Sequence, residues 1–331
     1  MTALAPGRRP ATILDVAAAA GVSRQTVTRA MNDMPGISRS TRERVLAVAS
    51  DLSYRPSRHA RGLVSGARHQ LGLVVNDLTN PFSPELAAAV VRAASDRSWN
   101  VMVADATLSR NAEDALRNLG DQVDVVVGYL GDRAPEWRRM LGAVPVVELD
   151  PDPSTAGPAV LVDPGPAIEQ LADYLVGVGV RHPAILDSGG DDRPSLRGAR
   201  MRDALERRGY LPVMESSAQH ATDAADATRR LLARGRRLDA ILAFNDLMAL
   251  GALDACRRAG LDVPRDIRIT GVDGLAIGTY LTPTLTTLPL DLGRVAAEAL
   301  DLARAVTSGT PPVGADAIRR VENTLLRRDS A

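Results

Sequence analysis

The sequence predicts a small all-α module followed by a larger α/β core of two parallel-sheet subdomains. Within residues 12–51, apolar side chains recur every three or four positions, which is typical of short amphipathic helices. From residue 71 onward, runs rich in β-branched apolar residues alternate with helical stretches, a pattern that indicates parallel strands covered on both faces. A chain of 331 residues is also long enough for about two to three domains.

The first predicted helix begins after Thr12. Its apolar residues fall at i, i+3, i+4 and i+7 from Ile13 and form one stripe that can be buried. Thr12 and Asp15 have the spacing of a capping box, which closes the N-terminus of this helix. Gly21 and Val22 then interrupt the pattern, so a tight turn is expected there.

A second helix is expected after Ser23, which can cap it, with Val27, Ala30 and Met31 facing inward. Its outer face carries long or hydrogen-bonding side chains, namely Arg24, Gln25, Thr28 and Arg29. Arginine and glutamine match the donor and acceptor patterns of guanine and adenine in the DNA major groove, and a helix N-terminus favours anions. A solvated polar face is the alternative interpretation.

A third helix is expected from about Ser40, with Ser40 and Glu43 as a second capping box. Its apolar positions have the same helical spacing and are Val45, Val48, Ala49 and Leu52. Three short helices of this kind are enough for one small hydrophobic core.

The charge is unevenly distributed along the chain. Residues 1–70 contain 11 Arg against 4 Asp and Glu, a balance of +7, and the remainder has a balance of −7. A basic module on an acidic body is typical of a protein that presents one end to nucleic acid. No apolar run is long enough to span a membrane, and the segment MTALAPGRRP lacks the apolar core of a secretory signal. A cytoplasmic protein is therefore expected.

The sequence also argues against several classes of enzyme. All 40 basic residues are Arg, whereas a P-loop and a Schiff-base cofactor site both require lysine. No strand is followed by G-x-G-x-x-G, there is no G-x-S-x-G elbow, and the four histidines do not pair at metal spacing. Cys256, the single cysteine, is expected to be packed rather than reactive. We therefore expect no enzymatic activity, no cofactor and no metal site.

Two series of strands are expected in the core. The first comprises the runs LGLVVND, NVMVAD, VDVVVGYL and VPVVELD. The second comprises PAILDS, a helix over 195–208, DAILAFND, a helix over 247–259, and DIRITGVDG. The repetition predicts two similar α/β subdomains that face each other. Ligands of such sheets bind at the carboxyl ends of the strands.

Polar residues follow several of these strands. Asn80 and Phe82 come after the first run, Arg197 after PAILDS, Asn245 after AILAF, and Asp273 after IRITGV. An arginine, amides and a carboxylate that converge on one cleft suit a hydroxyl-rich ligand, and a phenylalanine suits the apolar face of a sugar.

Each of these strand-end residues also has a purely structural interpretation. Asn245 or Asp246 can cap the helix that begins there. Arg197 can be an ordinary charge on a helix surface, and Asp273 can turn the chain before Gly274. The agreement of four positions favours the ligand-binding interpretation.

The run DVAAAAGVSRQTVTRAMN resembles the DNA-binding signature of the lactose-repressor and galactose-repressor (LacI/GalR) family of bacterial transcriptional regulators. The likeness continues through SRSTRERVLAVASDLSYRPSRHARGL. The resemblance implies a periplasmic-binding-protein-like core with two doubly wound parallel-sheet subdomains. The implied divisions are a flexible arm at 1–11, a helix-turn-helix DNA-binding domain at 12–56, a hinge helix and linker at 57–70, and an effector-binding and dimerisation core at 71–331, with an N-subdomain at about 71–162 plus 290–322 and a C-subdomain at about 163–289.

The resemblance implies DNA contacts from the helix-turn-helix and the hinge. The implied residues are Thr12, Ser23, Arg24, Gln25, Thr26, Thr28, Arg29, Asn32, Tyr54, Ser57, Ala60 and Leu63. Leu63 matches the leucine that wedges between base steps when two hinge helices meet in the minor groove. The family usually has Asn in place of Ser57 and a serine or similar residue in place of Gly62. The glycine at this position lowers helix propensity by about 1 kcal/mol relative to Ala.

The family's effector motifs also have counterparts in this sequence, as NPF, an arginine before small residues, ND with MALGAL, and G-x-D. The implied effector-binding residues are Asn80, Phe82, Glu148, Arg197, Asn245 and Asp273. Three positions depart from the family: Gly274 replaces a polar residue, Arg200 replaces a glycine, and Glu148 occupies a strand end that is often apolar. The extra carboxylate and the missing polar group favour an unusual or cationic ligand.

The resemblance implies a transcriptional repressor that binds a pseudo-palindromic operator in double-stranded DNA as a homodimer. A small-molecule effector, a sugar or sugar derivative in the cleft between the subdomains, would control it. The alternative is a solute-binding protein of the same core fold with no role in gene regulation. Such a protein would need a secretory signal and would have no use for a basic helical module.

Overall fold

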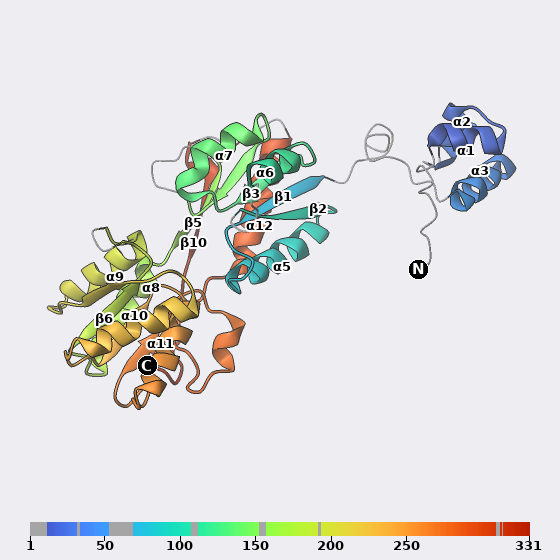
Figure 1. Cartoon of the computed structure of the whole chain (residues 1–331). Coiled ribbons are helices and arrows are strands. Elements are labelled where there is room, and N and C mark those ends of the chain that lie inside the picture. Colours follow the sequence, from blue (N-terminus) through green and yellow to red (C-terminus); the bar gives the residue numbers. More distant parts are fainter. Residues whose placement is uncertain are drawn as a thin grey trace, which may run out of the picture. The chain divides into compact units, whose positions relative to one another are not determined.

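The computed structural model describes residues 12–31, 34–52, 69–106, 112–151, 157–190, 193–308, 312 and 314–331. The chain forms two compact units, Met1–Arg68 and His69–Ala331, which Figure 1 colours along the sequence. The described part of the first unit is helical, and the second unit contains two parallel sheets. The predicted fold class is therefore confirmed. No helix in the described ranges is long and apolar enough to cross a membrane.

The first unit contains three helices, α1 (Ile13–Ala20), α2 (Arg24–Met31) and α3 (Arg39–Asp51). Their small core has Val16, Val27 and Val45 at its centre, and all three are fully buried. The predicted capping box at α1 is present, because Thr12 accepts a hydrogen bond from the backbone of Asp15 and Asp15 accepts one from the backbone of Thr12. The helical periodicity alone predicted this core.

The predicted start of α3 at about Ser40 is close to the observed start at Arg39, but the predicted cap at Ser40 is wrong. Ser38 is the cap, and its hydroxyl accepts a hydrogen bond from the backbone N–H of Thr41 at 3.1 Å. The side chain of Glu43 pairs with Arg39 instead of closing a capping box. Ile37 packs against the helical core, so the chain turns into the helix immediately after it.

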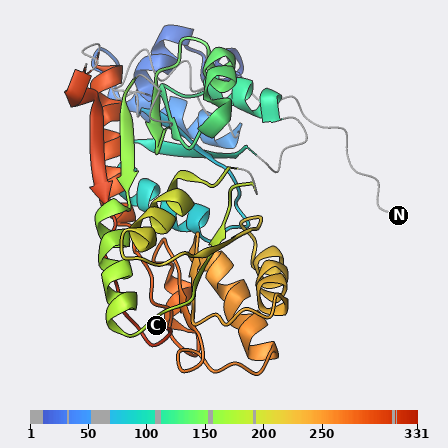
Figure 2. The same ribbon diagram turned by 90° about the vertical axis from the view of Figure 1, so that its left-hand side faces the viewer.

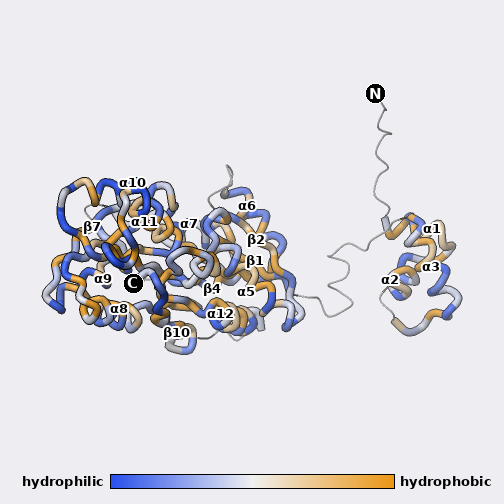
Figure 3. Tube along the Cα trace, turned by 90° about the horizontal axis from the view of Figure 1, so that it is seen from below, coloured by the Kyte–Doolittle hydropathy of each residue, from blue (hydrophilic) through white to orange (hydrophobic). Residues whose placement is uncertain are grey.

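The second unit begins with a six-stranded parallel sheet in the order β10-β5-β4-β3-β1-β2. The strands are β1 (Gln70–Val75), β2 (Asn100–Asp105), β3 (Val125–Gly128), β4 (Val146–Leu149), β5 (Ala159–Asp163) and β10 (Ile318–Glu322). One face packs against α5 (Phe82–Ser95) and α12 (Leu292–Thr307), and the other against α6 (Ala112–Gly120) and α7 (Ala134–Leu141). Figure 3 shows hydrophobic and hydrophilic residues alternating along these helices, as expected for helices that bury one face.

The other sheet is four-stranded and parallel, in the order β7-β6-β8-β9. Its strands are β6 (Pro183–Asp187), β7 (Val213–Ser216), β8 (Ala240–Ala243) and β9 (Arg268–Thr270). The helices α8 (Gly165–Gly177) and α9 (Leu196–Glu206) pack on one face, and α10 (Ala221–Ala233) and α11 (Asp246–Arg258) pack on the other. Short 3-10 helices lie at Gly131–Arg133, Ala276–Thr279 and Gly314–Ala317. Both sheets are thus covered by helices on two faces.

The chain passes three times between the two α/β halves of this unit. It leaves the six-stranded sheet after β5, returns before α12, and leaves again after β10. Beyond β10, Asn323 donates a hydrogen bond to the carbonyl of Leu288, and Leu326 pairs with Thr287 in the other half. Figure 2 shows β5 and β10 side by side, with their carboxyl ends directed toward the second half. Residues at the ends of these two strands are therefore placed beside both halves.

Candidate functional site

The outer face of α2 is the first candidate surface. Arg24 and Gln25 are exposed in the first turn of this helix, and the hydroxyl of Thr28 donates to the carbonyl of Arg24 at 3.1 Å. Arg29 lies partly buried beside the turn at Gly36, where an added Cβ would be 2.8 Å from the Arg29 guanidinium. Arg24 and Gln25 are therefore more exposed than Thr28 and Arg29 on this face.

Three other predicted DNA-contacting residues, Thr12, Ser23 and Thr26, form hydrogen bonds within the first turns of α1 and α2. The hydroxyl of Thr12 donates to the carboxylate of Asp15 at 2.7 Å. Ser23 accepts from the backbone N–H of Thr26 at 3.1 Å and bonds the Thr26 hydroxyl at 2.9 Å, so it caps α2 as predicted. The remaining predictions, at Asn32, Tyr54, Ser57, Ala60 and Leu63, lie outside the described residues.

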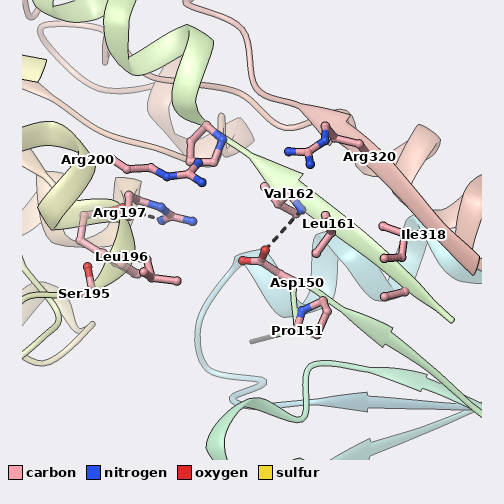
Figure 4. A pocket seen from close by; sticks show the side chains of 13 residues that line it. Asp150, Pro151, Leu161, Val162, Ser195, Leu196, Arg197, Arg200, Ile318 and Arg320 are labelled. Atoms are coloured by element: carbon pink, nitrogen blue, oxygen red, sulfur yellow. Dashed lines mark hydrogen bonds between the residues drawn. The ribbon is translucent and has the colours of Figure 1, made fainter. Parts of the chain in front are cut away.

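A cavity of about 510 Å³ in the second unit is the other candidate site. Both α/β halves contribute to it, as the close-up in Figure 4 shows. Its lining consists of Asp150, Pro151, Ala159, Leu161, Val162, Pro164, Ser195, Leu196, Arg197, Arg200, Phe244, Ile318 and Arg320. The volume lies in the range of roughly 300–1,000 Å³ that is typical of small-molecule sites.

Arg197 is held in the cavity by contacts on several sides. Its guanidinium donates a hydrogen bond to the carbonyl of Phe244 at 2.7 Å and lies over the Phe244 ring, 4.3 Å from the centroid. The same guanidinium is 3.8 Å from the carboxylate of Asp273. The Arg197 side chain is only 18% exposed, so it is fixed in place rather than free on a helix surface.

The start of α9 is set by Asp187, the last residue of β6. Its buried carboxylate accepts hydrogen bonds from the backbone N–H and the hydroxyl of Ser195, at 2.7 and 2.5 Å. Gly198 approaches so closely that an added Cβ would be 2.4 Å from this carboxylate. Asp187 thereby positions Arg197, a role that its place at the end of PAILDS could have indicated.

Asp273 lies behind Arg197 in a strained conformation, with φ at +116°. Burial raises its pKa to about 8, with smaller contributions from Asp246 and Glu85, while Arg197 acts in the opposite direction. Such a carboxyl group is largely protonated at neutral pH and can donate as well as accept hydrogen bonds.

The first half contributes Asp150 to the lining of the cavity, and Tyr129 interacts electrostatically with Asp150. Asp150 follows β4 with φ at +45° and accepts a hydrogen bond from the backbone N–H of Val162 at 3.3 Å. Burial raises the pKa of Asp150, and burial together with the charges of Asp150 and Asp273 raises the pKa of Tyr129. These influences show that Tyr129, Asp150, Asp273 and Arg197 share one electrostatic environment.

Asn245 and Asp246 follow β8 and hold the local backbone. Asn245 caps α11, since its side-chain oxygen accepts from the backbone N–H of Met248 at 2.7 Å. Asp246 is fully buried and accepts from the backbone N–H of Leu275 and the hydroxyl of Thr287, at 2.7 and 2.5 Å. The predicted cap is therefore Asn245, whereas Asp246 binds the backbone of Leu275 and the side chain of Thr287, and neither residue lines the cavity.

Asn80 and Phe82 are also absent from the lining of the cavity. The side-chain oxygen of Asn80 accepts a hydrogen bond from the backbone N–H of Phe82 at 3.1 Å, which shapes the turn into α5. The ring of Phe82 meets that of Tyr129 edge-on, with centroids 5.9 Å apart. Phe82 therefore packs beside Tyr129 and not in the lining of the cavity.

Glu148 does not belong with the other candidates. It is fully buried within β4, where it pairs with the guanidinium of Arg138 from α7 at 2.9 Å. The strand continues to Leu149, and the carboxylate that enters the cavity belongs to Asp150. The predicted extra carboxylate at Glu148, and the cationic ligand inferred from it, therefore lose their basis.

Two arginines of the cavity were not predicted from the sequence as ligand-binding residues. Arg200 was noted only as a departure from the family, and Arg320 was not noted at all. Both line the cavity. The signal for Arg200 was its position three residues after Arg197, nearly one helical turn along the same face. Nothing local distinguishes Arg320 from its neighbour Arg319.

Comparisons with known proteins agree on both parts of the chain. Residues 12–57 match the profile described as bacterial regulatory proteins, lacI family, and residues 172–331 match the periplasmic binding protein-like domain. Catabolite control protein A of Priestia megaterium is 33% identical over 300 residues, which cover 86% of this chain and 90% of that protein.

Two solved structures are similar as well. A LacI family transcriptional regulator from Arthrobacter sp. FB24, in complex with lactose, is 34% identical with a TM-score of 0.74, over 80% of this chain and 99% of that one. The lac repressor dimer bound to operator and the anti-inducer ONPF is 27% identical with a TM-score of 0.82, over 97% and 99% of the two chains.

Proposed function

The chain belongs to the lacI family of bacterial regulatory proteins, and we propose that it represses transcription by binding an operator as a homodimer under the control of a carbohydrate effector. Its relatives regulate transcription and are not enzymes. The observation that carries the proposal is the capped helix α2, on which Arg24 and Gln25 are exposed. The protein would act in the cytoplasm, where its DNA is.

Operator recognition by α2 follows from its chemistry. Arginine donates in a bidentate manner to guanine, and glutamine does the same with adenine, so two such side chains at one helix start can distinguish base pairs. A two-fold dimer would present two copies of α2 to half-sites about one helical turn apart. The lac repressor dimer bound to operator supports this arrangement by analogy.

Effector binding is supported by the chemistry of the cavity. Arg197 supplies hydrogen-bond donors, and Phe244 supplies an aromatic ring. Asp150 supplies a carboxyl group, and burial raises its pKa. Fixed polar groups around an aromatic face suit a sugar. The lactose complex of the Arthrobacter regulator supports a sugar as the ligand.

Control would follow from the position of the cavity, which both α/β halves line. A ligand that binds one relative angle of the halves better than another shifts the population toward that angle. A coupling of about 1–3 kcal/mol between effector and operator is typical of allosteric proteins. Without the helical module, the same core could serve only as a solute-binding protein.

The decisive experiment selects duplexes that bind the full-length protein from a random DNA library. We expect enrichment of a pseudo-palindrome. Gln25→Ala should then change the preferred base at one position of each half-site by about 1–3 kcal/mol. Arg39→Ala, at an exposed residue of α3, is the matched control and should leave the preference unchanged. Absence of any enriched sequence would contradict the proposal, and equal losses on all sequences would make Gln25 a phosphate contact.

A further inference from the structure

Three arginines from two different elements face the same cavity. Arg197 and Arg200 come from α9 in one α/β half, and Arg320 comes from β10 in the other. Figure 4 shows their guanidinium groups directed toward the space beside Leu161 and Val162. Among the residues that the structure describes, Asp150 is the only acidic one in the lining. The lining is therefore richer in fixed positive charge than a site for a neutral sugar requires.

Asp163 holds two of these arginines from beneath the cavity. Its carboxylate accepts from Arg200 at 2.8 Å, from Arg320 at 2.7 Å and from the backbone N–H of Gly165 at 3.0 Å. Burial opposes ionisation of Asp163, but the bonds from Gly165, Arg320 and Arg200 outweigh it and lower its pKa. One ionised carboxylate thus fixes two guanidinium groups.

The two arginines are more exposed than the carboxylate that binds them. The side chain of Asp163 is 17% exposed, whereas those of Arg200 and Arg320 are 50% and 55% exposed. A guanidinium has five N–H donors, and the bond to Asp163 occupies one on each arginine. Several donors on each therefore remain for a further acceptor. Two guanidinium groups, each able to donate two parallel hydrogen bonds, best match an acceptor with several anionic oxygens.

The rest of the cavity has a different character. Leu161, Leu196 and Ile318 give an apolar wall, and Phe244 lies under Arg197. A ligand that fills this space needs an anionic end at Arg200 and Arg320, and a hydroxyl-bearing body with an apolar face at Arg197 and Phe244.

We propose that the effector is an acidic sugar, a carbohydrate that carries a phosphate or a carboxylate, and that Arg200 and Arg320 bind its anionic group. The proposal rests on the proposed function, because it assumes that this cavity is the effector site. Arg200 belongs to one α/β half and Arg320 to the other, so an anion between them ties the halves together. The anionic group thereby contributes to the relative angle of the halves, in addition to the contacts that the neutral part of the sugar makes with both halves.

The first test uses inorganic phosphate as a probe of the anion subsite in the full-length protein. Sodium phosphate replaces sodium chloride at constant ionic strength, and thermal unfolding is followed, because a ligand of the folded state raises Tm by mass action. We expect phosphate to raise the Tm of the wild type. Arg200→Gln and Arg320→Gln should each reduce this increase, and the variant that carries both substitutions should show the smallest increase.

Arg202→Gln is the matched control, since Arg202 lies on the same helix and pairs with Asp203 and Glu206 instead of facing the cavity. It should retain the wild-type response to phosphate. Because each substitution removes an ion pair, every variant is compared with its own Tm in chloride. An equal phosphate response in the wild type and both cavity variants, or no response in the wild type, would overturn the proposal.

The second test compares matched sugars by calorimetry: ribose with ribose 5-phosphate, glucose with glucose 6-phosphate, and glucose with glucuronate. The phosphate and carboxylate pairs distinguish the two sources of charge. We expect an acidic member to bind at least about tenfold more tightly than its neutral partner in the wild type, and this preference to disappear in Arg320→Gln. A neutral sugar that binds the wild type and both variants equally and releases the operator would overturn the acidic ligand and leave the proposed function intact. If the protein bound no operator, the proposed function would be wrong. The phosphate titration would still show whether the anion subsite exists.

Discussion

At the scale of single residues, the cavity depends on how its charges are compensated. Arg197 is bonded to a carbonyl, stacked on Phe244 and close to Asp273, so its guanidinium cannot leave the site. Asp273 is buried behind it with a raised pKa. Arg197 therefore keeps its charge at all ordinary pH values, whereas the charge of Asp273 depends on pH.

Arg197→Ala tests whether this arginine binds the effector. Loss of a charged hydrogen-bond donor costs about 1.5–3 kcal/mol, so the affinity for the responsive sugar should fall at least about tenfold. Operator affinity without effector, measured by fluorescence anisotropy, should remain close to that of the wild type. Arg202→Ala on the same helix provides the control. A full effector response in Arg197→Ala would exclude the proposed site.

The raised pKa of Asp273 predicts a pH dependence of stability. The folded state keeps a proton up to a pKa of about 8, whereas the unfolded chain loses it near the ordinary value of 3.8. This contribution to stability is complete below the unfolded pKa and is lost as pH rises through the folded pKa. Between pH 5.5 and 8 the wild type should therefore lose on the order of 1–3 kcal/mol that Asp273→Asn does not lose.

Urea unfolding of both proteins at the two pH values measures this difference. Asparagine tolerates positive φ, so the variant should keep the local backbone. Identical slopes of stability against pH would show that Asp273 is ionised in the folded protein.

At the scale of elements, caps and close approaches fix where helices begin and how near they lie. The capping box at α1 and the Asn245 cap of α11 follow from local spacing and were predicted. The approach of α11 to α10 does not follow from local spacing. It requires Gly251, where an added Cβ would be 2.1 Å from the carbonyl of Ala221.

Gly251→Ala should therefore destabilise the folded protein. Overpacking against backbone costs about 1–3 kcal/mol, which exceeds the gain in helix propensity from replacing glycine. Gly177→Ala, at the end of α8 with open space around it, is the matched control and should be neutral or stabilising by up to about 1 kcal/mol. Denaturant unfolding compares the two variants. Equal stabilities would mean that α10 and α11 separate at little cost.

At the scale of the whole molecule, a helical unit and an α/β unit are joined through a segment outside the described residues. The first unit presents Arg24 and Gln25, and the second holds the cavity. If the proposed function holds, the two sites must be coupled, because a repressor that senses a sugar has to convert occupancy of the cavity into operator affinity.

Thermodynamic linkage makes this coupling testable. If the effector changes the operator Kd by a factor of about 5–150, the operator must change the effector Kd by the same factor. Anisotropy titrations of operator with and without effector, and calorimetry of effector with and without operator, measure the two factors. Leu63→Ala should weaken operator binding and leave the effector affinity of the DNA-free protein unchanged. If the change in operator Kd and the change in effector Kd were unequal, the proteins in the two titrations would differ in more than ligand occupancy, for example in oligomeric state.

The sequence by itself determined the helix-turn-helix, the order of strands and helices, and the positions of Arg197 and Asp273 after strands, because periodicity, caps and strand ends are local properties. Only the tertiary structure decided which charges meet. Glu148 was predicted to bind the ligand, but it lies within the strand and pairs with Arg138, while Asp150 enters the cavity. Arg200 and Arg320 are distant in sequence and are brought together by Asp163 where β5 leaves its sheet. The direction of a charged side chain and the charges that pair with it depend on its neighbours in space. Residue spacing therefore identified Arg197, but not the other residues that line the cavity.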